Sequence, residues 1–412
     1  MNRFIQIHTL TSYPASLLNR DDAGFAKRIP FGGATRTRIS SQCLKRHWRT
    51  FEGQGSLSEL GVAGSVRSRF AFEELVVKPL VREGVEDELA RGVTQAIMDE
   101  VLGKSAKAKK EAAEEGEGKT KAKKGKEPAG EREERPALQT GQITVLGRPE
   151  INYLLELARK VCATKPDVSK AAKAVEDELK GDVRKNLALL KNAAGLDAAL
   201  FGRMVTSDNL ARGDAAVHVA HALTVHAEAS ESDYFSAMDD LLPTREEALG
   251  SGHIGTSELT SGLFYGYVVV DVPLLVSNLE GVDRKEWEKA DRDVAAKVVE
   301  RLVRLVATVS PGAKLGSTAP HAYAHLVLVE AGNAQPRTLA NAFLRPARQE
   351  PDVVENAYRA LAKHAGELDR MYGNAFARRL AALGEAEGLR DALRAPAVES
   401  LAAFAGREVR GT

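Results

Sequence analysis

Short segments in which apolar and polar residues alternate occur along the chain, together with longer segments in which apolar residues recur at helical spacing. Residues 4–10 alternate apolar and polar side chains, which predicts a half-buried strand. Residues 60–103 and 149–202 repeat apolar side chains every three or four positions and predict a helical lobe. The Val- and Tyr-rich segment 262–276 is the strongest strand signal, and a further strand is expected at 325–330.

The remaining segments carry other signals. Residues 104–135 hold nine Lys, two Arg and eight Glu with no large apolar residue, so we expect disorder there. Residues 215–225 indicate a return to the sheet or a helix packed on it, and 230–255 is polar and turn-rich. A helical pattern resumes from Asn341, with breaks expected at Gly373, Gly384 and Gly388. The predicted fold class is α+β, with a sheet assembled from distant segments and hence a discontinuous domain.

The overall composition shows that any attraction to a polyanion must be local, because 58 Lys and Arg balance 57 Asp and Glu. Cys43 and Cys162 are too few for a disulfide framework or a thiolate zinc site, which suits a reducing compartment. The N-terminus has no apolar signal core, and no stretch is apolar enough to cross a bilayer. We therefore expect a cytoplasmic protein with no membrane partner.

Residues 23–51 depart from the charge balance of the chain. They contain no Asp or Glu, where the average acid content would place about four. The same acid-free segment has seven basic residues, which are Lys27, Arg28, Arg36, Arg38, Lys45, Arg46 and Arg49. This segment is where a polyanion is expected to bind.

The acid-free segment offers three ways to hold phosphate. Arg36 and Arg38 alternate on an extended stretch and would point to one side. A helix is expected to begin at Ser40 or Ser41, which can cap it so that its free N–H groups attract an anion. One face of that helix would carry Gln42, Lys45, Arg46 and Arg49, and the opposite face Leu44, Trp48 and Phe51. A helix face that is merely exposed to solvent normally carries charges of both signs, so the absence of acidic residues favours a nucleic-acid site.

Catalytic and metal chemistry have little support in the sequence. His8 and His47 are candidates for acid–base chemistry on RNA, but a lone histidine on a strand or helix is more often structural. His218, His221 and His226 have no acidic or thiol partner at ligand spacing. We predict no catalytic residue, no metal and no cofactor. The alternatives left open are an endoribonuclease that processes precursor RNA and a generic single-strand RNA chaperone.

The run from Phe4 to Arg49, which includes most of the acid-free segment, resembles the CasC family of the RAMP superfamily, and so do later positions. That family is the repeated backbone subunit of the type I-E CRISPR surveillance complex, Cascade. The insertion at 104–135 departs from the compact family pattern. The resembling positions span most of the chain in order and are Leu18–Asp22, Phe31–Gly33, Arg38–Gln42, Leu44–Arg46, Gly202–Met204, Ala220–Ala222, His226, Asp239–Asp240, Ser261–Gly262, Phe264–Tyr265, Gly312–Lys314 and Ala340–Phe343.

The resemblance implies an RRM-like (ferredoxin-like) discontinuous palm, a helical fingers insertion and a protruding thumb. The implied division is palm at 1–58, 203–229 and 257–412, fingers at 59–202 with the disordered insertion at 104–135, and thumb at 230–256.

The resemblance also implies a non-catalytic protein that oligomerises along CRISPR RNA (crRNA), grips its backbone and presents the guide to target DNA in antiviral defence. The implied partners are crRNA, the target DNA strand, further copies of the chain and other Cascade subunits. Met204 would wedge against displaced bases. Together with Arg36 and Arg38 from the charge pattern, the residues expected to bind RNA are Arg20, Lys27, Ser40, Gln42, Lys45, Arg46, Arg49, Met204 and Lys314.

Tyr234 and Phe235 form an aromatic pair in the implied thumb. They either stack on a base where the thumb interrupts the RNA, or pack against the palm or a neighbouring subunit. Both alternatives stay open, because acidic residues surround the pair and would repel phosphate. These acids are Glu228, Glu231, Asp233, Asp239 and Asp240.

Overall fold

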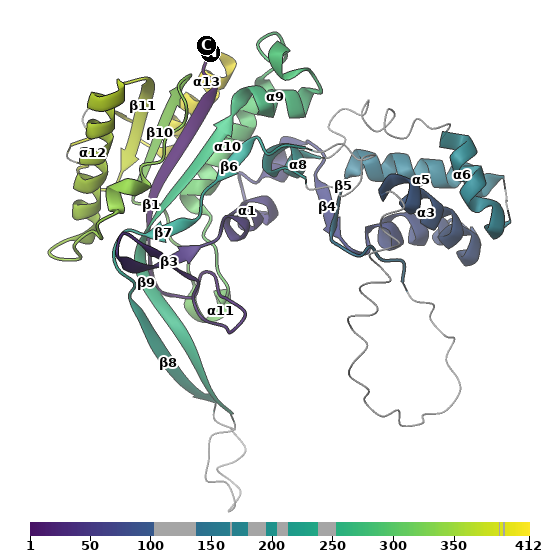
Figure 1. Cartoon of the computed structure of the whole chain (residues 1–412), viewed down its shortest axis with the longest axis horizontal. Coiled ribbons are helices and arrows are strands. Elements are labelled where there is room, and N and C mark those ends of the chain that lie inside the picture. Colours follow the sequence, from purple (N-terminus) through teal and green to yellow (C-terminus); the bar gives the residue numbers. More distant parts are fainter. Residues whose placement is uncertain are drawn as a thin grey trace, which may run out of the picture. The chain divides into compact units, whose positions relative to one another are not determined.

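The chain forms two compact units in a computed structural model (Figure 1). The first unit comprises Met1–Leu60, Val217–Pro273 and Asp291–Thr412, and the second comprises Gly61–Ala216 and Leu274–Ala290. The expected disordered insertion at 104–135 lies outside the described residues. The structure describes residues 1–102, 137–164, 167–179, 195–203, 213–237, 253–386, 388–389 and 392–412.

A large mixed sheet organises the first unit and confirms the α+β class. Along its main path the strand order is β12-β11-β10-β1-β9-β7-β3-β2, and β6 and β8 pair separately with β9. Neighbours are antiparallel except β11 and β12. The strands are β1 (Phe4–Ser16), β2 (Arg28–Phe31), β3 (Ala34–Ile39), β6 (Val217–Val219), β7 (Ala222–Thr224), β8 (Ser230–Ala237), β9 (His253–Asp271), β10 (Leu326–Gly332), β11 (Phe376–Ala382) and β12 (Leu393–Arg394).

Helices cover both faces of this sheet. Residues of α12 pack with apolar side chains of β1, β9 and β10 in one core cluster. On the opposite face, α10 packs against α13, β1 and α1, as Figure 1 shows. The helices of the first unit are α1 (Ser41–Thr50), η1 (Leu57–Leu60), α10 (Asp293–Thr308), α11 (Leu315–Thr318), η6 (Ala340–Phe343), α12 (Val353–Tyr372) and α13 (Val398–Arg410).

The second unit is mainly helical, with a separate two-stranded sheet. Its core combines buried residues of η2, α3, α5 and α6, which agrees with the helical lobe predicted from apolar spacing. The elements are β4 (Ser65–Ser68), η2 (Glu73–Val77), α2 (Lys78–Arg82), α3 (Asp87–Leu102), β5 (Thr144–Gly147), α5 (Arg148–Ala163), η3 (Val168–Lys170), α6 (Ala171–Leu179), α8 (Leu196–Phe201), α9 (Val272–Glu280) and η5 (Arg284–Glu286).

The first strand is more buried than its alternation predicts. β1 lies between β9 and β10, with Ile7 opposite both Val268 and Val329. Alternation sends Ile7 to one face and His8 to the other, yet both side chains are fully buried. The expectation of a half-buried strand is therefore wrong, because helices cover the polar face as well.

Three other expectations differ from the structure. The strand signal at 262–276 ends at Asp271, and the apolar residues after it form α9. The polar stretch 230–255 is strand over Ser230–Ala237 rather than turns. The helical pattern from Asn341 is interrupted by β11, whose sequence FARRLAA lacks β-branched residues but pairs with β10 along its full length. Tertiary pairing overrides local propensity at β11.

Candidate nucleic-acid interface

Helix α1 begins at Ser41, as the sequence predicts. Ser40 has extended backbone angles, and its Oγ accepts a hydrogen bond from the Cys43 N–H at 3.3 Å. The Ser40 N–H donates to Asn19 Oδ1 at 2.9 Å, so the cap is fixed to the preceding loop. No acidic residue lies in the first turn of the helix. The positive end of the helix dipole is thus left without a local carboxylate.

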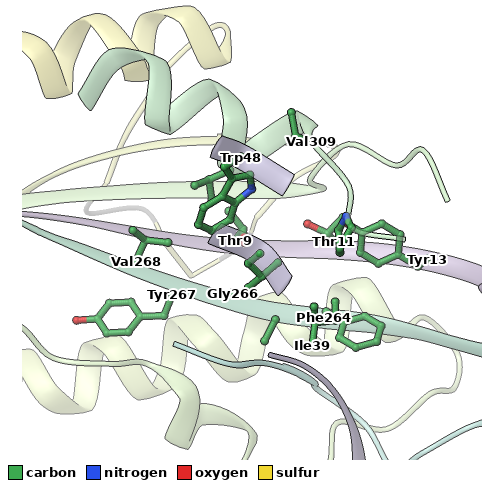
Figure 2. Close-up of a pocket in the computed structure, with 14 residues that line it drawn as sticks. Thr9, Thr11, Tyr13, Ile39, Trp48, Phe264, Gly266, Tyr267, Val268 and Val309 are labelled. Carbon is green, nitrogen blue, oxygen red and sulfur yellow. The ribbon is translucent and has the colours of Figure 1, made fainter. Parts of the chain in front are cut away.

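The apolar face of α1 docks on the sheet (Figure 2). Leu44 and Trp48 are buried, and with Thr9 and Gly266 they line a cavity of about 30 Å³, where Figure 2 shows Trp48 next to Thr9. Of the opposite face, Gln42 and Arg46 are exposed, and Lys45 and Arg49 are half-buried. The docking therefore presents the polar face outward, as predicted.

Gly266 on β9 leaves room for the side chain of Thr9, which lies opposite it on β1. A Cβ at this position would lie 2.6 Å from Thr9 Oγ1, so Gly266→Ala is expected to cost about 1–3 kcal/mol of unfolding free energy. In Gly366→Ala, on α12, the new methyl meets nothing within 4 Å, and we expect a gain of about 0.5–1 kcal/mol. Urea unfolding of both variants checks the pair. Equal midpoints would contradict the steric argument.

Cations of the acid-free segment surround one small region beside α1. Burial lowers the pKa of the His221 imidazole and raises the pKa of the Cys43 thiol, and nearby cations lower both pKa values. The causes of the two shifts include no carboxylate among the described residues. Hydrogen bonds bring the same cations together, because the Arg38 N–H donates to Lys27 O at 2.8 Å and the Arg38 side chain meets the first residue of α1 at His221. Lys45 and Arg46 are neighbours on that helix. This cationic surface consists of Lys27, Arg38, Lys45 and Arg46.

His221 ties the cationic surface to the start of α1. Its Nδ1 accepts the Ser41 N–H at 3.2 Å and lies 3.2 Å from an amino group of Arg38. The N–H groups of Ser41 and Cys43 are therefore both used inside the protein. Free N–H groups at the start of the helix were one of the three expected ways to hold phosphate. The N–H groups of Ser41 and Cys43 are not free and do not serve that purpose. The positive side chains supply the attraction.

His221 gives the fold a pH dependence whose sign is fixed. Because its pKa is lowered in the folded protein, the unfolded chain binds more protons as the pH falls below about 6.5. The contribution of neutral His221 to stability is complete above that pH and is lost as the pH falls through the folded pKa. We expect the urea midpoint to fall more between about pH 7.5 and 5.5 in the wild type than in His221→Asn. Parallel profiles would contradict this.

Arg36 is a correction to the expected RNA contacts. Its side chain is fully buried, and its guanidinium donates to three backbone carbonyls: Thr224 O at 2.9 Å, Phe343 O at 2.8 Å and Phe31 O at 3.3 Å. Burial also lowers the pKa of Arg36. Arg36 therefore has no exposed charge to offer a ligand, and it holds together strand β3, strand β7 and the segment around η6.

Arg28 is a second member of the acid-free segment whose charge is used within the protein. It forms ion pairs with Glu228 and Glu258, which lie at the base of the β8–β9 hairpin. Glu258 also accepts the Ala26 N–H at 2.7 Å. The acid-free segment thus anchors the hairpin through Arg28, a role for which the local sequence carries no signal.

The other expected contacts lie in varied settings. Arg20 is exposed and forms an isolated bridge with Ala26. Ser40 is buried, and its hydroxyl serves the helix cap. Lys314 is half-buried, with its Nζ 5.7 Å from the centre of the Phe235 ring. The expected wedge residue, Met204, lies outside the described residues.

The expected thumb contains a two-stranded ribbon, β8 paired with β9. Residues 253–259 of β9 pair with β8 beyond the register that β9 shares with β1, so the hairpin extends past β1 (Figure 1). Tyr234 is 64% exposed and Phe235 is 41% exposed. Adjacent residues of a strand point to opposite faces, so these aromatics do not form one stacking platform.

The two candidate catalytic histidines have structural partners. His8 is fully buried, with Nδ1 2.8 Å from the Tyr265 hydroxyl and Nε2 3.3 Å from Glu330. His47 Nε2 accepts the Gly312 N–H at 3.3 Å, so Nδ1 carries the proton and donates to Cys43 O at 2.8 Å. Neither arrangement leaves an imidazole nitrogen for acid–base work on RNA.

Two negative findings concern metals and membranes. Within the described part of the chain, no group of three or more His, Cys, Asp or Glu side chains could hold a metal ion. None of the helices there combines the length and apolar character needed to span a membrane.

Comparison with known proteins places the chain in a family. The family model described as CT1975-like protein matches residues 5–405. A solved chain of a "CRISPR RNA-guided surveillance complex, pre-nicking" superposes with a TM-score of 0.73 at 25% identity, covering 98% of this chain and 100% of that chain. A chain of another "CRISPR RNA-guided surveillance complex" shares the fold, with a TM-score of 0.63, 22% identity and coverage of 97% and 99%.

No curated protein matches the chain in sequence. The family model nevertheless spans almost all of it, from the first strand to the last helix. The chain therefore belongs to the CT1975-like protein family, the Cas7-type backbone proteins of CRISPR RNA-guided surveillance complexes.

Proposed function

We propose that this protein is the repeated backbone subunit of a type I-E Cascade and that copies of it assemble along crRNA. The observation that carries the proposal is the cationic surface, which gathers Lys27, Arg38, Lys45 and Arg46 beside α1 in a chain of balanced charge. Arg49 and Gln42 extend the same outward face of α1. Such a surface holds a phosphate backbone and is indifferent to base sequence.

The division of labour follows from that chemistry. Cations that contact phosphate position an RNA strand, while base pairing between guide and target supplies the specificity. The protein holds crRNA extended for pairing with a target DNA strand in antiviral defence. Arg20 and Met204 are part of the proposed RNA contact.

We assign the architectural parts as the family resemblance implies. The proposed palm is RRM-like and covers 1–58, 203–229 and 257–412, with fingers at 59–202 and a thumb at 230–256. The long β1, β9 and β10 pairing at the centre of the sheet supports a discontinuous palm, and the β8–β9 hairpin supports a protruding thumb.

We assign no catalytic step to the protein. The endoribonuclease alternative needs a free imidazole, but both candidate histidines are bonded within the protein. His8 is bonded in the core, and His47 is bonded to Cys43 and Gly312. Incubation of the pure protein with repeat-containing RNA is expected to give stoichiometric protection. Multiple turnovers of cleavage would contradict this assignment.

Co-expression with a CRISPR array tests the assembly itself. The mass of the native complex is expected to rise in steps of one subunit as the crRNA is lengthened, and nuclease footprinting is expected to give regularly spaced accessible nucleotides. A single bound copy at every RNA length would instead identify a generic single-strand RNA chaperone. Uniform protection would argue against a thumb that interrupts the RNA.

A further inference from the structure

His47 joins α1 to a loop that is distant in the sequence. Its Nδ1 donates to Cys43 O at 2.8 Å, which is a contact within the helix. Its Nε2 accepts the Gly312 N–H at 3.3 Å, and Gly312 lies 265 residues further along the chain. The side chain is half-buried, and Arg46 next to it belongs to the cationic surface. His47 therefore connects the helix that carries the proposed phosphate contacts to another part of the same unit.

The loop that His47 contacts contains α11 and is braced by its own bonds. Ser310 Oγ donates to Ala322 O and accepts the Ala322 N–H, both at 2.9 Å, and these two bonds close the loop. A Cβ on Gly312 would lie 2.4 Å from Leu315 Cδ2, so the loop also packs closely on itself. We therefore expect this α11 loop to move as one body, so that a bond at Gly312 fixes the whole of it.

The α11 loop meets the β8–β9 hairpin through Lys314. This residue comes two positions after Gly312, directly before the first residue of α11. Its Nζ lies 5.7 Å from the centre of the Phe235 ring on β8, within cation–π range. The Phe235 ring in turn covers Gly255 of the paired strand β9, where a Cβ would lie 2.4 Å from the ring. A continuous path of contacts thus runs from α1 to the hairpin.

The contact at Phe235 is a second support for the hairpin. Ion pairs of Arg28 with Glu228 and Glu258 hold it at its base. Phe235 pairs with Gly255, which lies three residues beyond Glu258 along β9 and hence about 10 Å further out. Supports at two distances fix the direction of the hairpin, whereas one support would leave it free to pivot.

We propose that His47 and Lys314 are positioning residues, which fix the β8–β9 hairpin in a set direction relative to the outward face of α1. The proposal rests on the proposed function and deepens it, because copies along one RNA give regular intervals only if each holds its hairpin and its phosphate contacts at the same separation. It also gives His47 a role that needs no chemistry on RNA.

Two substitutions of His47 isolate its bond to Gly312. Glutamine can place its side-chain oxygen near the position of Nε2 and accept the Gly312 N–H, whereas leucine cannot, and both residues favour a helix. Hydrogen–deuterium exchange of the full-length protein without RNA reports on the hairpin. His47→Leu is expected to speed exchange of the β8 amides about two- to five-fold, a range set by the cation–π contact as the weaker link. His47→Gln is expected to keep the wild-type rate.

Lys314 is tested by the same measurement. Lys314→Met is expected to speed β8 exchange about two- to five-fold, and Lys314→Arg, which keeps a cation over the ring, is expected to leave it unchanged. His47→Leu combined with Lys314→Met is expected to add nothing to either single variant, because both interrupt the same path. Multiplied effects in the double variant, or equal effects of Lys314→Arg and Lys314→Met, would overturn the path.

Binding of crRNA separates a positioning role from a direct contact. His47→Leu removes no cation, so the salt dependence of RNA binding is expected to match the wild type. The contrast between accessible and protected nucleotides in the nuclease footprint is expected to fall, and His47→Gln is expected to restore it. A shallower salt dependence in His47→Leu would place His47 among the phosphate contacts and overturn the proposal, as would unchanged β8 exchange. Failure of the proposed function would appear instead as a wild type that binds no RNA, and the exchange measurements, which contain no RNA, would still decide the path.

Discussion

Complexes purified with Lys45→Glu and Arg49→Glu together are expected to contain no RNA. Both side chains lie on the outward face of α1, whose opposite face is buried through Leu44 and Trp48, so the substitutions leave the docking of the helix intact. The double reversal places two negative charges where the cationic surface and its extension along α1 had two positive charges. Absorbance of the purified protein at 260 and 280 nm measures the bound RNA.

The matched control is the double reversal Arg359→Glu with Lys363→Glu. These residues lie on α12, with side chains 61% and 77% exposed, and the net charge changes equally. This control is expected to keep its RNA. Full RNA content in Lys45→Glu/Arg49→Glu, or equal loss in the control, would remove α1 from the binding site.

Neutral substitutions at the same positions refine the result. Lys45→Gln with Arg49→Gln is expected to retain weak binding, so that the salt dependence can be measured. For a single strand, removal of one phosphate-binding cation lowers the slope of log affinity against log salt by about 0.7. The double variant is therefore expected to be shallower than the wild type by about 1.4.

Arg36→Met is expected to produce a large loss of stability. Methionine fills much of the volume but leaves the carbonyls of Phe31, Thr224 and Phe343 without their shared donor. A buried polar group left unpaired costs about 1–3 kcal/mol, so a total of at least about 3 kcal/mol is expected for the three carbonyls. A lower urea midpoint with an unchanged slope would identify a stability effect.

The measurement can be confined to the unit that contains Arg36. The tryptophans are Trp48 in the first unit and Trp287 in the second, so a Trp287→Phe background leaves Trp48 as the reporter. Arg38→Met, two positions along the same strand, removes only the interaction with His221 and is expected to cost under about 1 kcal/mol. Similar costs for the two variants would show that the hydrogen bonds from Arg36 to the carbonyls matter little.

The sequence predicts those elements whose partners are close in the chain. The cap at Ser40 and the two faces of α1 depend on residues within ten positions, and both are confirmed. β11 is missed because its strand character comes from β10, about fifty residues earlier, and not from its own composition. The burial of His8 on the far face of β1 is likewise invisible without α12.

The same distinction applies to the charged residues of the acid-free segment. The absence of acids over 23–51 correctly marks a concentration of positive charge, because charge sign is legible in a linear sequence. The charge pattern cannot distinguish Arg36 and Arg28, which are bonded inside the protein, from the other basic residues of the acid-free segment. Their partners, Thr224, Phe343 and Glu258, lie about 190 to 310 residues further along the chain. Only the folded structure shows which arginine side chains are bonded inside the protein and which are exposed and able to bind a ligand.

The second unit is not a simple insertion into the first. It takes in Leu274–Ala290 as well as Gly61–Ala216, and Asn278 donates to the carbonyls of Ala199 and Asp214 across that separation. A single deletion of Gly61–Ala216 would leave Leu274–Ala290 in the chain without the two carbonyls that Asn278 contacts. Natural shortening or laboratory exchange of this unit therefore has to alter two stretches of the gene together, which limits how freely the unit can be traded between relatives.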